Sequence, residues 1–272
     1  MESRMKTQIF CTLPAVVLLT LVLLAGFAQA DAVTFQQGIN GYAGTSDTWL
    51  GYNDDLENFG NDWDIHVRHD WYGTYDDRVT LIKFDLGSLP SNAVITGASL
   101  SLLYYDDYNI SGDDSLTVSA YRMLKSWTEG TGGSGNGRTG ASWYYQYAYP
   151  STTQWYNGGA RGVNQDRQTN PDASVTLYNI DGYAWTTFSG SSITASVANW
   201  YADPSQNFGW ALDYTSYSDS TDGAIFHSSE YSTSPADYVW RPKMTIDYYI
   251  VPEPATLSLL VIGALSLLRR KK

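Results

Sequence analysis

The chain has almost no cysteine. Its single cysteine, Cys11, lies in an apolar stretch near the N-terminus, so the rest of the 272 residues contains no thiol. Disulfides, cysteine-based zinc sites and a cysteine nucleophile are therefore excluded from that part of the chain. Its stability has to come from packing, from hydrogen bonds and, as a prediction, from bound calcium.

Positive charge is also scarce. The sequence has 16 Lys and Arg against 28 Asp and Glu, and residues 31–250 keep 10 basic and 26 acidic residues, a net charge of −16. Nucleic-acid binding requires basic side chains that replace phosphate counterions, so this composition argues against a nucleic-acid partner. An acidic surface suits solubility and the binding of divalent cations.

Signals of catalysis are missing as well. The three histidines are His66, His69 and His227, and His66-x-x-His69 is followed by no third ligand in a metal-binding pattern. The sequence contains no Gly-x-Ser-x-Gly elbow, P-loop or His-Glu-x-x-His motif. A glycosidase pair of carboxylates cannot be recognised by spacing among so many acids. We therefore predict a protein that is not an enzyme.

What the chain has in abundance is aromatic residues and glycine, with 22 Tyr, 10 Trp and 24 Gly, which favours strands and turns. Residues 93–105 and 243–249 alternate apolar and polar side chains, and RVTLIKFDL (78–86) is apolar on both faces, as a central strand would be. Further strands are predicted at 115–123, 174–180, 207–214 and 223–229. Ile193, Val197 and Trp200 follow a helical spacing that Asp203-Pro204 should end. The pattern predicts an all-β, antiparallel β-sandwich with one or two short helices.

Both ends of the sequence read as targeting segments. Arg4 and Lys6 precede an apolar stretch that ends at Ala28-Gln29-Ala30, so residues 1–30 are predicted to be a secretory signal peptide. Near the other end, residues 255–268 carry no charge and are followed by four cations. Fourteen helical residues reach roughly 21 Å, less than the hydrocarbon core of about 30 Å, so this run is more typical of a processed signal than of a permanent anchor.

The last residues resemble the PEP-CTERM sorting signal of Gram-negative bacteria. The resemblance is carried by Pro252, Glu253 and Pro254, by the hydrophobic run 255–268, and by Arg269 and Arg270. It implies that residues 250–272 insert transiently into the inner membrane, are recognised by an exosortase and are removed. The expected location is then the cell envelope, the cell surface or an extracellular polysaccharide matrix.

The body of the chain is similar to a second family, the DNRLRE-type domain, which is classed with the family-96 carbohydrate-binding modules. Matching pieces run in order over residues 34–249, and the most specific is the strand pair RVTLIKFDLGSLPSNAVITGASLSL. The resemblance implies one jelly-roll-like β-sandwich domain at 31–249, non-catalytic, with polysaccharide binding in some members. The sequence departs from the family at residues 63–75, which are long and polar where the family has a brief turn.

Residues 129–172 lack any strand pattern but are rich in aromatic residues, which disordered segments lack. Sugar binding needs flat rings beside side chains that hydrogen-bond hydroxyl groups. The predicted glycan contacts all lie here: Trp143, Tyr145, Trp155, Tyr156 and Asn157. The alternative is that these rings plug the open end of the sandwich.

Acidic pairs are the candidates for calcium ligands, because calcium takes six to eight oxygens. The predicted ligands are Asp54, Asp55, Asp62 and Asp64, with solvated turns as the alternative. Since the body is strongly acidic, the expected glycan is neutral, or anionic and bridged by calcium. The predicted function is an exported, non-catalytic polysaccharide-binding protein. The alternative is a structural matrix or surface protein without a glycan ligand, and a glycoside hydrolase or polysaccharide lyase is the least favoured.

Overall fold

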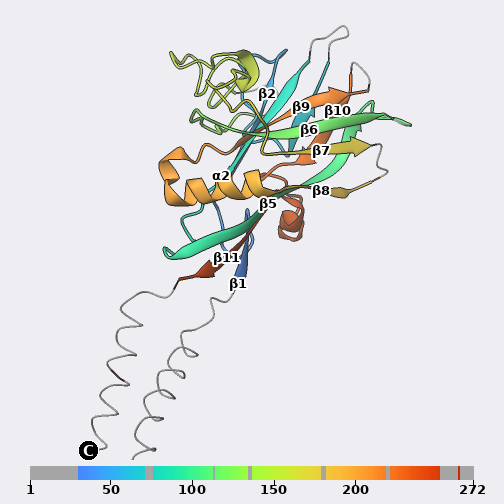
Figure 1. Cartoon of the computed structure of the whole chain (residues 1–272). Coiled ribbons are helices and arrows are strands. Elements are labelled where there is room, and N and C mark those ends of the chain that lie inside the picture. Colours follow the sequence, from blue (N-terminus) through green and yellow to red (C-terminus); the bar gives the residue numbers. More distant parts are fainter. Residues whose placement is uncertain are drawn as a thin grey trace, which may run out of the picture. The chain divides into compact units, whose positions relative to one another are not determined.

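The computed structural model describes residues 30–70, 76–112, 114–133, 137–178, 182–218, 221–251 and 263 (Figure 1). The predicted sorting signal, apart from its start and Gly263, and residues 1–29 of the predicted signal peptide lie outside the described residues. Within the described part, no helix has the length and apolar character needed to cross a membrane.

The described fold is all-β, as predicted. Its strands are β1 (Ala30–Gln36), β2 (Thr45–Gly51), β3 (Asp64–Arg68), β4 (Arg78–Phe84), β5 (Ala93–Tyr108), β6 (Ser115–Arg122), β7 (Ala173–Tyr178), β8 (Ala184–Ser189), β9 (Trp210–Tyr217), β10 (Gly223–His227) and β11 (Lys243–Ile250). They are accompanied by helix α2 (Ser191–Ala202) and by the 3₁₀ segments η1 (Gly158–Ala160), η2 (Pro204–Gln206) and η3 (Pro235–Trp240). The prediction of an antiparallel, sandwich-like fold with short helices is confirmed.

The strands form one curled, hydrogen-bonded sheet in the order β1-β11-β5-β10-β3-β4-β9-β6-β7. Two strands branch from this path, because β2 pairs with β4 and β8 pairs with β5. The long strand β5 pairs with two strands at the same residue. Tyr104 lies opposite Ala184 of β8 and opposite Phe226 of β10. Strands distant in sequence are thereby placed next to each other.

The chain divides into two compact units. The larger unit comprises residues 32–89 and 95–247, and it contains all the sites described below. The smaller unit contains both chain ends and Pro90–Val94. Its described residues are joined by hydrogen bonds from the Val251 N–H to the Asn92 carbonyl (3.1 Å) and from the Tyr248 hydroxyl to Asp31 (3.3 Å).

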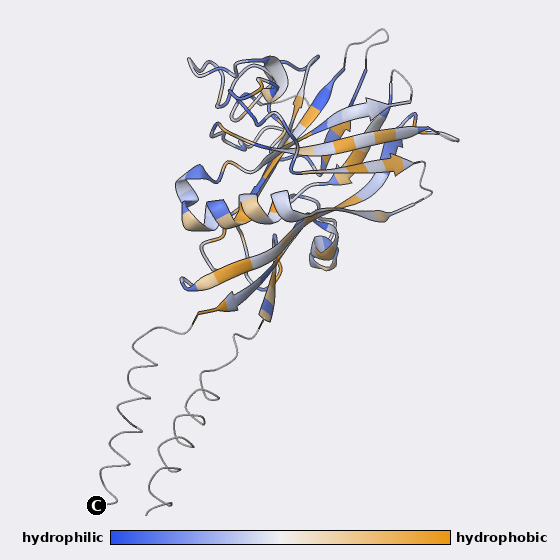
Figure 2. Ribbon diagram, in the orientation of Figure 1, coloured by the Kyte–Doolittle hydropathy of each residue, from blue (hydrophilic) through white to orange (hydrophobic). Residues whose placement is uncertain are grey.

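Each of the seven predicted strands is observed, with ends that differ by a few residues. The alternation that predicted them is visible as hydrophobic and hydrophilic bands along the strands in Figure 2. Four strands were not predicted, namely β1, β2, β3 and β8. Strand β3 lies in the polar segment 63–75, where His66 and Arg68 make it resemble a loop.

Helix α2 confirms the helical spacing read from the sequence. Ile193, Val197 and Trp200 are buried on one face, and the helix ends at Ala202, before Asp203-Pro204. Trp200 packs edge-on against Trp210 of β9, with ring centroids 4.5 Å apart. The Thr194 hydroxyl accepts the Ala98 N–H of β5 (3.1 Å), which fixes the helix to the sheet.

Residues 129–172 form an irregular segment that packs on the sheet. In its described parts, the regular structure between β6 and β7 is η1. Its apolar side chains join those of β2, β4 and β9 in one buried cluster: Leu50, Val79, Leu81, Met123, Trp127, Ala141, Trp143, Trp155, Ala160 and Ala211. The segment is therefore part of the hydrophobic core.

Candidate functional site

The two tryptophans predicted to bind glycan lie in the core. Trp143 and Trp155 are each only 5% exposed. The chain packs directly on the Trp143 indole, because a Cβ added at Gly159 would lie 2.7 Å from that ring, and Trp155 Nε1 donates to the Ser142 carbonyl (3.0 Å). The prediction of an exposed platform is wrong for these two residues. Their indoles are large apolar groups, and burying them against β2 and β4 removes more apolar area from water than any exposed position.

The other three predicted contacts reach the surface in part. Tyr156 is 72% exposed and Asn157 is exposed, whereas Tyr145 is half-buried and packs edge-on against Tyr149. The backbone N–H groups of Tyr156 and Asn157 both donate to the Asp166 carboxylate (2.8 and 3.0 Å). This turn presents a single exposed ring, which is less than an extended sugar needs for stacking.

The predicted calcium ligands are brought together only in part. Asp54, Asp62 and Asp64 line one hollow of about 330 Å³, which also holds Arg78, while Asp55 is not among its lining residues. Asp64 already accepts hydrogen bonds from the Tyr105 hydroxyl and His66. In the described ranges, no group of three or more His, Asp or Glu residues is arranged to hold a metal ion. The calcium site stays a prediction from sequence.

A different set of rings forms an exposed aromatic surface. We define the aromatic patch as Trp63, Tyr183, Tyr231 and Trp240, grouped around His227. They come from four places: the residue before β3, the residue before β8, the loop after β10, and the end of η3. Tyr183 is 62% exposed, Trp63 is 57% exposed, and Tyr183 stacks 5.7 Å from Trp240.

His227 at the centre of the patch is an anomaly. It is 2% exposed, and neither ring nitrogen has a hydrogen-bond partner. Tyr231 stacks on its imidazole at 3.6 Å and Tyr105 at 4.4 Å. Burial among these rings lowers the pKa of His227 to about 4, so the imidazole is neutral at pH 7. A neutral imidazole offers one donor and one acceptor, and leaving both unpaired costs free energy unless a ligand or water pairs with them.

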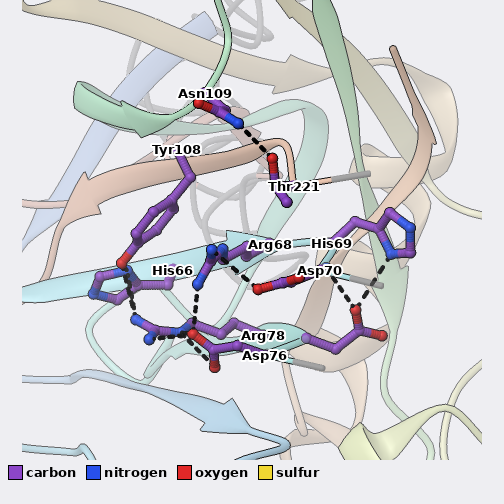
Figure 3. Close-up of polar contacts among 10 residues, drawn as sticks. His66, Arg68, His69, Asp70, Asp76, Arg78, Tyr108, Asn109 and Thr221 are labelled. Atoms are coloured by element: carbon purple, nitrogen blue, oxygen red, sulfur yellow. Dashed lines mark hydrogen bonds and ion pairs between the residues drawn. The ribbon is translucent and has the colours of Figure 1, made fainter. Parts of the chain in front are cut away.

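Strand β3 also carries His66 and Arg68, which belong to a charged network that is drawn in part in Figure 3. His66 bonds Asp64 through Nε2 (2.9 Å), and its Nδ1 receives the Tyr108 hydroxyl (3.1 Å). Asp64 in turn accepts from Tyr105, the ring that stacks on His227. Burial lowers the pKa of His66, which fits a neutral ring that donates from Nε2 and accepts at Nδ1. The network holds Tyr105 in position beneath the patch.

The rest of this network consists of ion pairs. Asp76 receives both Arg68 and Arg78 at 2.6 Å, and Arg68 also reaches Asp70 at 3.1 Å. His69 faces Asp77 at 3.3 Å, away from His66 in Figure 3. The two histidines of His66-x-x-His69 thus have separate carboxylate partners, and the structure does not bring them together as ligands of one metal.

A second network ties the irregular segment to the sheet. Arg161 pairs with Asp77 (2.6 Å) and with Asp213 of β9 (2.9 Å), and Arg167 also pairs with Asp213 (2.8 Å). Burial raises the pKa of Asp213, but the two guanidinium groups outweigh it and hold the pKa below its ordinary value. These charge pairs fix the segment that carries Trp143 and Trp155.

Three carboxylates meet beside the patch, which we call the acidic trio: Asp47, Glu129 and Glu230. The Asp47 N–H donates to Glu129 (2.7 Å), and Asp47 accepts the Ser229 N–H (2.9 Å) two residues before Tyr231. Burial, then the charges of Glu230 and Glu129, raise the pKa of Asp47 well above its ordinary value. Burial, then the charge of Glu230, raises the pKa of Glu129 to about 7.

Comparison with known proteins adds no assignment. No protein-family model and no curated protein matches the chain. The site is therefore argued from this chain's own residues.

Sequence reasoning missed the patch because its rings are far apart along the chain. Trp63 stands 120 residues before Tyr183, and Tyr231 and Trp240 follow 48 and 57 residues after it. No local spacing connects them. The one available signal was the His-Ser-Ser-Glu-Tyr run at 227–231, which places an aromatic ring two residues after the strand predicted at 223–229.

Proposed function

We propose that this chain is an exported, non-catalytic polysaccharide-binding protein, and that the aromatic patch is its sugar-contacting surface. The observation that carries the proposal is the grouping of four partly exposed rings around a buried, unpaired His227. Tyrosine and tryptophan rings pack on the apolar C–H faces of pyranose rings, while polar tips and neighbouring donors reach the hydroxyl groups.

The make-up of the patch favours an uncharged glycan. The body carries a net charge of −16, which repels acidic polymers at low salt. His227 is neutral at pH 7, so the centre of the patch carries no positive charge that would attract an acidic sugar. A neutral polysaccharide gains from stacking and loses nothing to this repulsion.

Binding without cleavage is supported by how Asp64, one of the carboxylates near the patch, is used. Asp64 lies under the patch, where it accepts hydrogen bonds from both Tyr105 and His66. A carboxylate held in this way orients the rings, whereas a glycosidase needs a pair of carboxyl groups on either side of a scissile bond.

Export, processing by an exosortase and a location in the envelope or polysaccharide matrix are proposed from sequence alone. They rest on the predicted signal peptide at 1–30 and the sorting signal at 250–272. The resemblance to the DNRLRE-type domain supports polysaccharide as the partner. Mass spectrometry of the protein from its native envelope tests this part, because a mature chain that keeps Arg269 and Arg270 would contradict the processing.

Affinity electrophoresis with soluble polymers tests the sugar surface. We expect retardation by a neutral glucan or mannan, and a Kd about tenfold weaker or more for Tyr183→Ala, because one stacking ring is lost. Tyr178→Ala is the matched control, since Tyr178 is 59% exposed but lies at the end of β7, outside the patch. Equal loss in both variants, or no retardation by any neutral or acidic polymer, would contradict the proposal and favour a structural matrix protein.

A further inference from the structure

A second concave site lies away from the aromatic patch. It is a cleft of about 440 Å³ where β2, the end of β4, the end of α2 and the turn after η2 meet. Its volume is within the range of small-molecule sites, about 300–1,000 Å³. Because three of its walls come from strands β2 and β4 and from helix α2, the shape of the cleft is set by regular secondary structure.

The polar groups of the cleft form a compact set. Ser46 and Lys83 lie directly opposite each other in the β2–β4 pair, Asp85 follows two residues later, and Asn207 lines the same cleft. The set contains one ammonium, one carboxylate, one hydroxyl and one amide. Donors and acceptors of this kind match neighbouring hydroxyl groups of a sugar, each of which both donates and accepts.

Asn207 supplies an acceptor that the protein does not use. Its Nδ2 donates to the Phe84 carbonyl (2.7 Å), which fixes the orientation of the amide. Its Oδ1 is buried and has no hydrogen-bond partner among the described residues. A buried acceptor that lacks a donor costs free energy, and a ligand hydroxyl would satisfy it.

Lys83 is the one cationic side chain among the residues that line the cleft. Its Nζ donates to the Trp127 carbonyl (3.3 Å), which takes one of the three N–H bonds of the ammonium group. Burial lowers the pKa of Lys83 below its ordinary value. The ammonium also lies over the Trp127 ring, 4.5 Å from its centroid, so the donors that it can offer a ligand in the cleft are those that Trp127 leaves free.

The remaining walls are apolar, and the cleft as a whole is close to neutral. Leu86 and Tyr201 line it beside the polar set, which suits one ring with an apolar face and a hydroxylated edge. The charges of Lys83 and Asp85 are opposite, so the cleft gives no preference for an anionic sugar.

We propose that this cleft binds a single uncharged pyranose residue, such as the end or a side branch of a polysaccharide chain. The choice of a sugar as ligand rests on the proposed function. The existence of the cleft rests only on the structure. The protein then has two sugar sites: the aromatic patch for the faces of a chain, and the cleft for one terminal ring.

Saturation-transfer difference NMR with methyl β-D-glucopyranoside, methyl α-D-mannopyranoside and sodium glucuronate tests the proposal on the whole body of the protein. We expect saturable transfer to at least one methyl glycoside and weaker transfer to glucuronate. Lys83→Met removes the donors and Tyr201→Ala removes a wall, and each should reduce the transfer about fivefold or more. Tyr201 is half-buried at the end of α2, so we expect Tyr201→Ala to fold. It therefore still tests the cleft if Lys83→Met fails to fold.

Tyr183→Ala is the control, because it alters the patch and leaves the cleft intact. Transfer unchanged in both cleft variants, absence of transfer, or equal transfer to glucuronate would overturn the inference. Loss of polymer binding in Tyr183→Ala without any glycoside signal would leave the proposed function standing and the cleft refuted. The opposite result would be a glycoside signal that is lost in the cleft variants, together with polymer binding that is unchanged in Tyr183→Ala. That result would refute the patch as the sugar surface and support the cleft.

Discussion

The irregular segment 129–172 and the aromatic patch are both rich in rings, yet they occupy opposite environments. In the segment, Trp143 and Trp155 fold inward and become core residues, while Tyr156 stays exposed. In the patch, rings from four distant places gather at the surface around His227. Density of aromatic residues along a chain therefore does not locate a binding surface. The neighbours that tertiary structure provides decide whether a ring is buried or exposed.

The largest effect that separates the two regions is expected from Trp143→Ala. Removing a buried indole that packs on Gly158 and Gly159 should lower the free energy of unfolding by about 3–5 kcal/mol. Tyr156→Ala, in the same segment but exposed, should change it by less than about 0.5 kcal/mol. Urea unfolding followed by circular dichroism measures both. Similar values for the two variants would mean that Trp143 is not part of the core.

The next largest effect is expected from Arg161→Ala. It leaves Asp77 without one partner and Asp213, which is 2% exposed, with Arg167 alone. An uncompensated buried charge should cost on the order of 3 kcal/mol. Arg138→Ala is the control, because Arg138 is exposed and packs only on Tyr149 within the same segment. If Arg161→Ala is as stable as that control, the ion pairs do not anchor the segment.

A smaller effect, and one that depends on pH, is expected beside the patch. The pKa of Glu129 is raised from 4.5 to about 7 in the folded state, so the folded protein binds more protons than the unfolded chain between these values. The stability that Glu129 contributes is present below pH 4.5 and is lost as pH rises through 7. Glu129→Gln should therefore stabilise the protein at pH 8 by on the order of 1–3 kcal/mol relative to wild type.

Thermal unfolding of wild type and Glu129→Gln from pH 4 to pH 9 measures this effect. His227 acts in the opposite direction, because its pKa is lowered to about 4 and its contribution is lost as pH falls through that value. It is common to both proteins and cancels in the comparison. A constant difference between Glu129→Gln and wild type at all pH values would refute the raised pKa.

The smallest effect is expected from calcium. Asp54, Asp62 and Asp64 line one hollow, but Arg78 shares it and Asp64 is already hydrogen-bonded. Adding excess calcium to protein treated with EDTA should raise the unfolding temperature by less than about 2 °C, equivalent to roughly 0.5 kcal/mol. A rise of many degrees, abolished by Asp62→Asn, would restore the calcium site predicted from sequence.

Much of the fold could be predicted from sequence because its central strands carry their own signal. Strand β4 is apolar on both faces, and β5 and β11 alternate, so local pattern and final structure agree. Strand β3 could not be predicted, because His66 and Arg68 face the charged network and its polar face reads as a loop. Its strand structure depends on β10 and β4 at its sides.

For the candidate site, the sequence predicted the type of residue, aromatic rings, but not their positions in the fold. The composition indicated aromatic sugar contacts, but their place depends on which strands become neighbours. Trp143 is buried because β2 and β4 cover it, and Tyr183 is exposed because β8 branches off the sheet at β5. Neither outcome is encoded within a few residues of the ring concerned.

The double pairing of Tyr104 has a consequence for how the protein can vary. Because Ala184 and Phe226 are both aligned on this one residue, β8 and β10 meet at β5 in a defined register, and Tyr183 and His227 are the next residues beyond these two positions. Substitution of Tyr183 can then change the surface while the strand register beneath it is retained. A one-residue insertion in β5 would instead move β8 and β10 relative to each other and abolish the surface altogether.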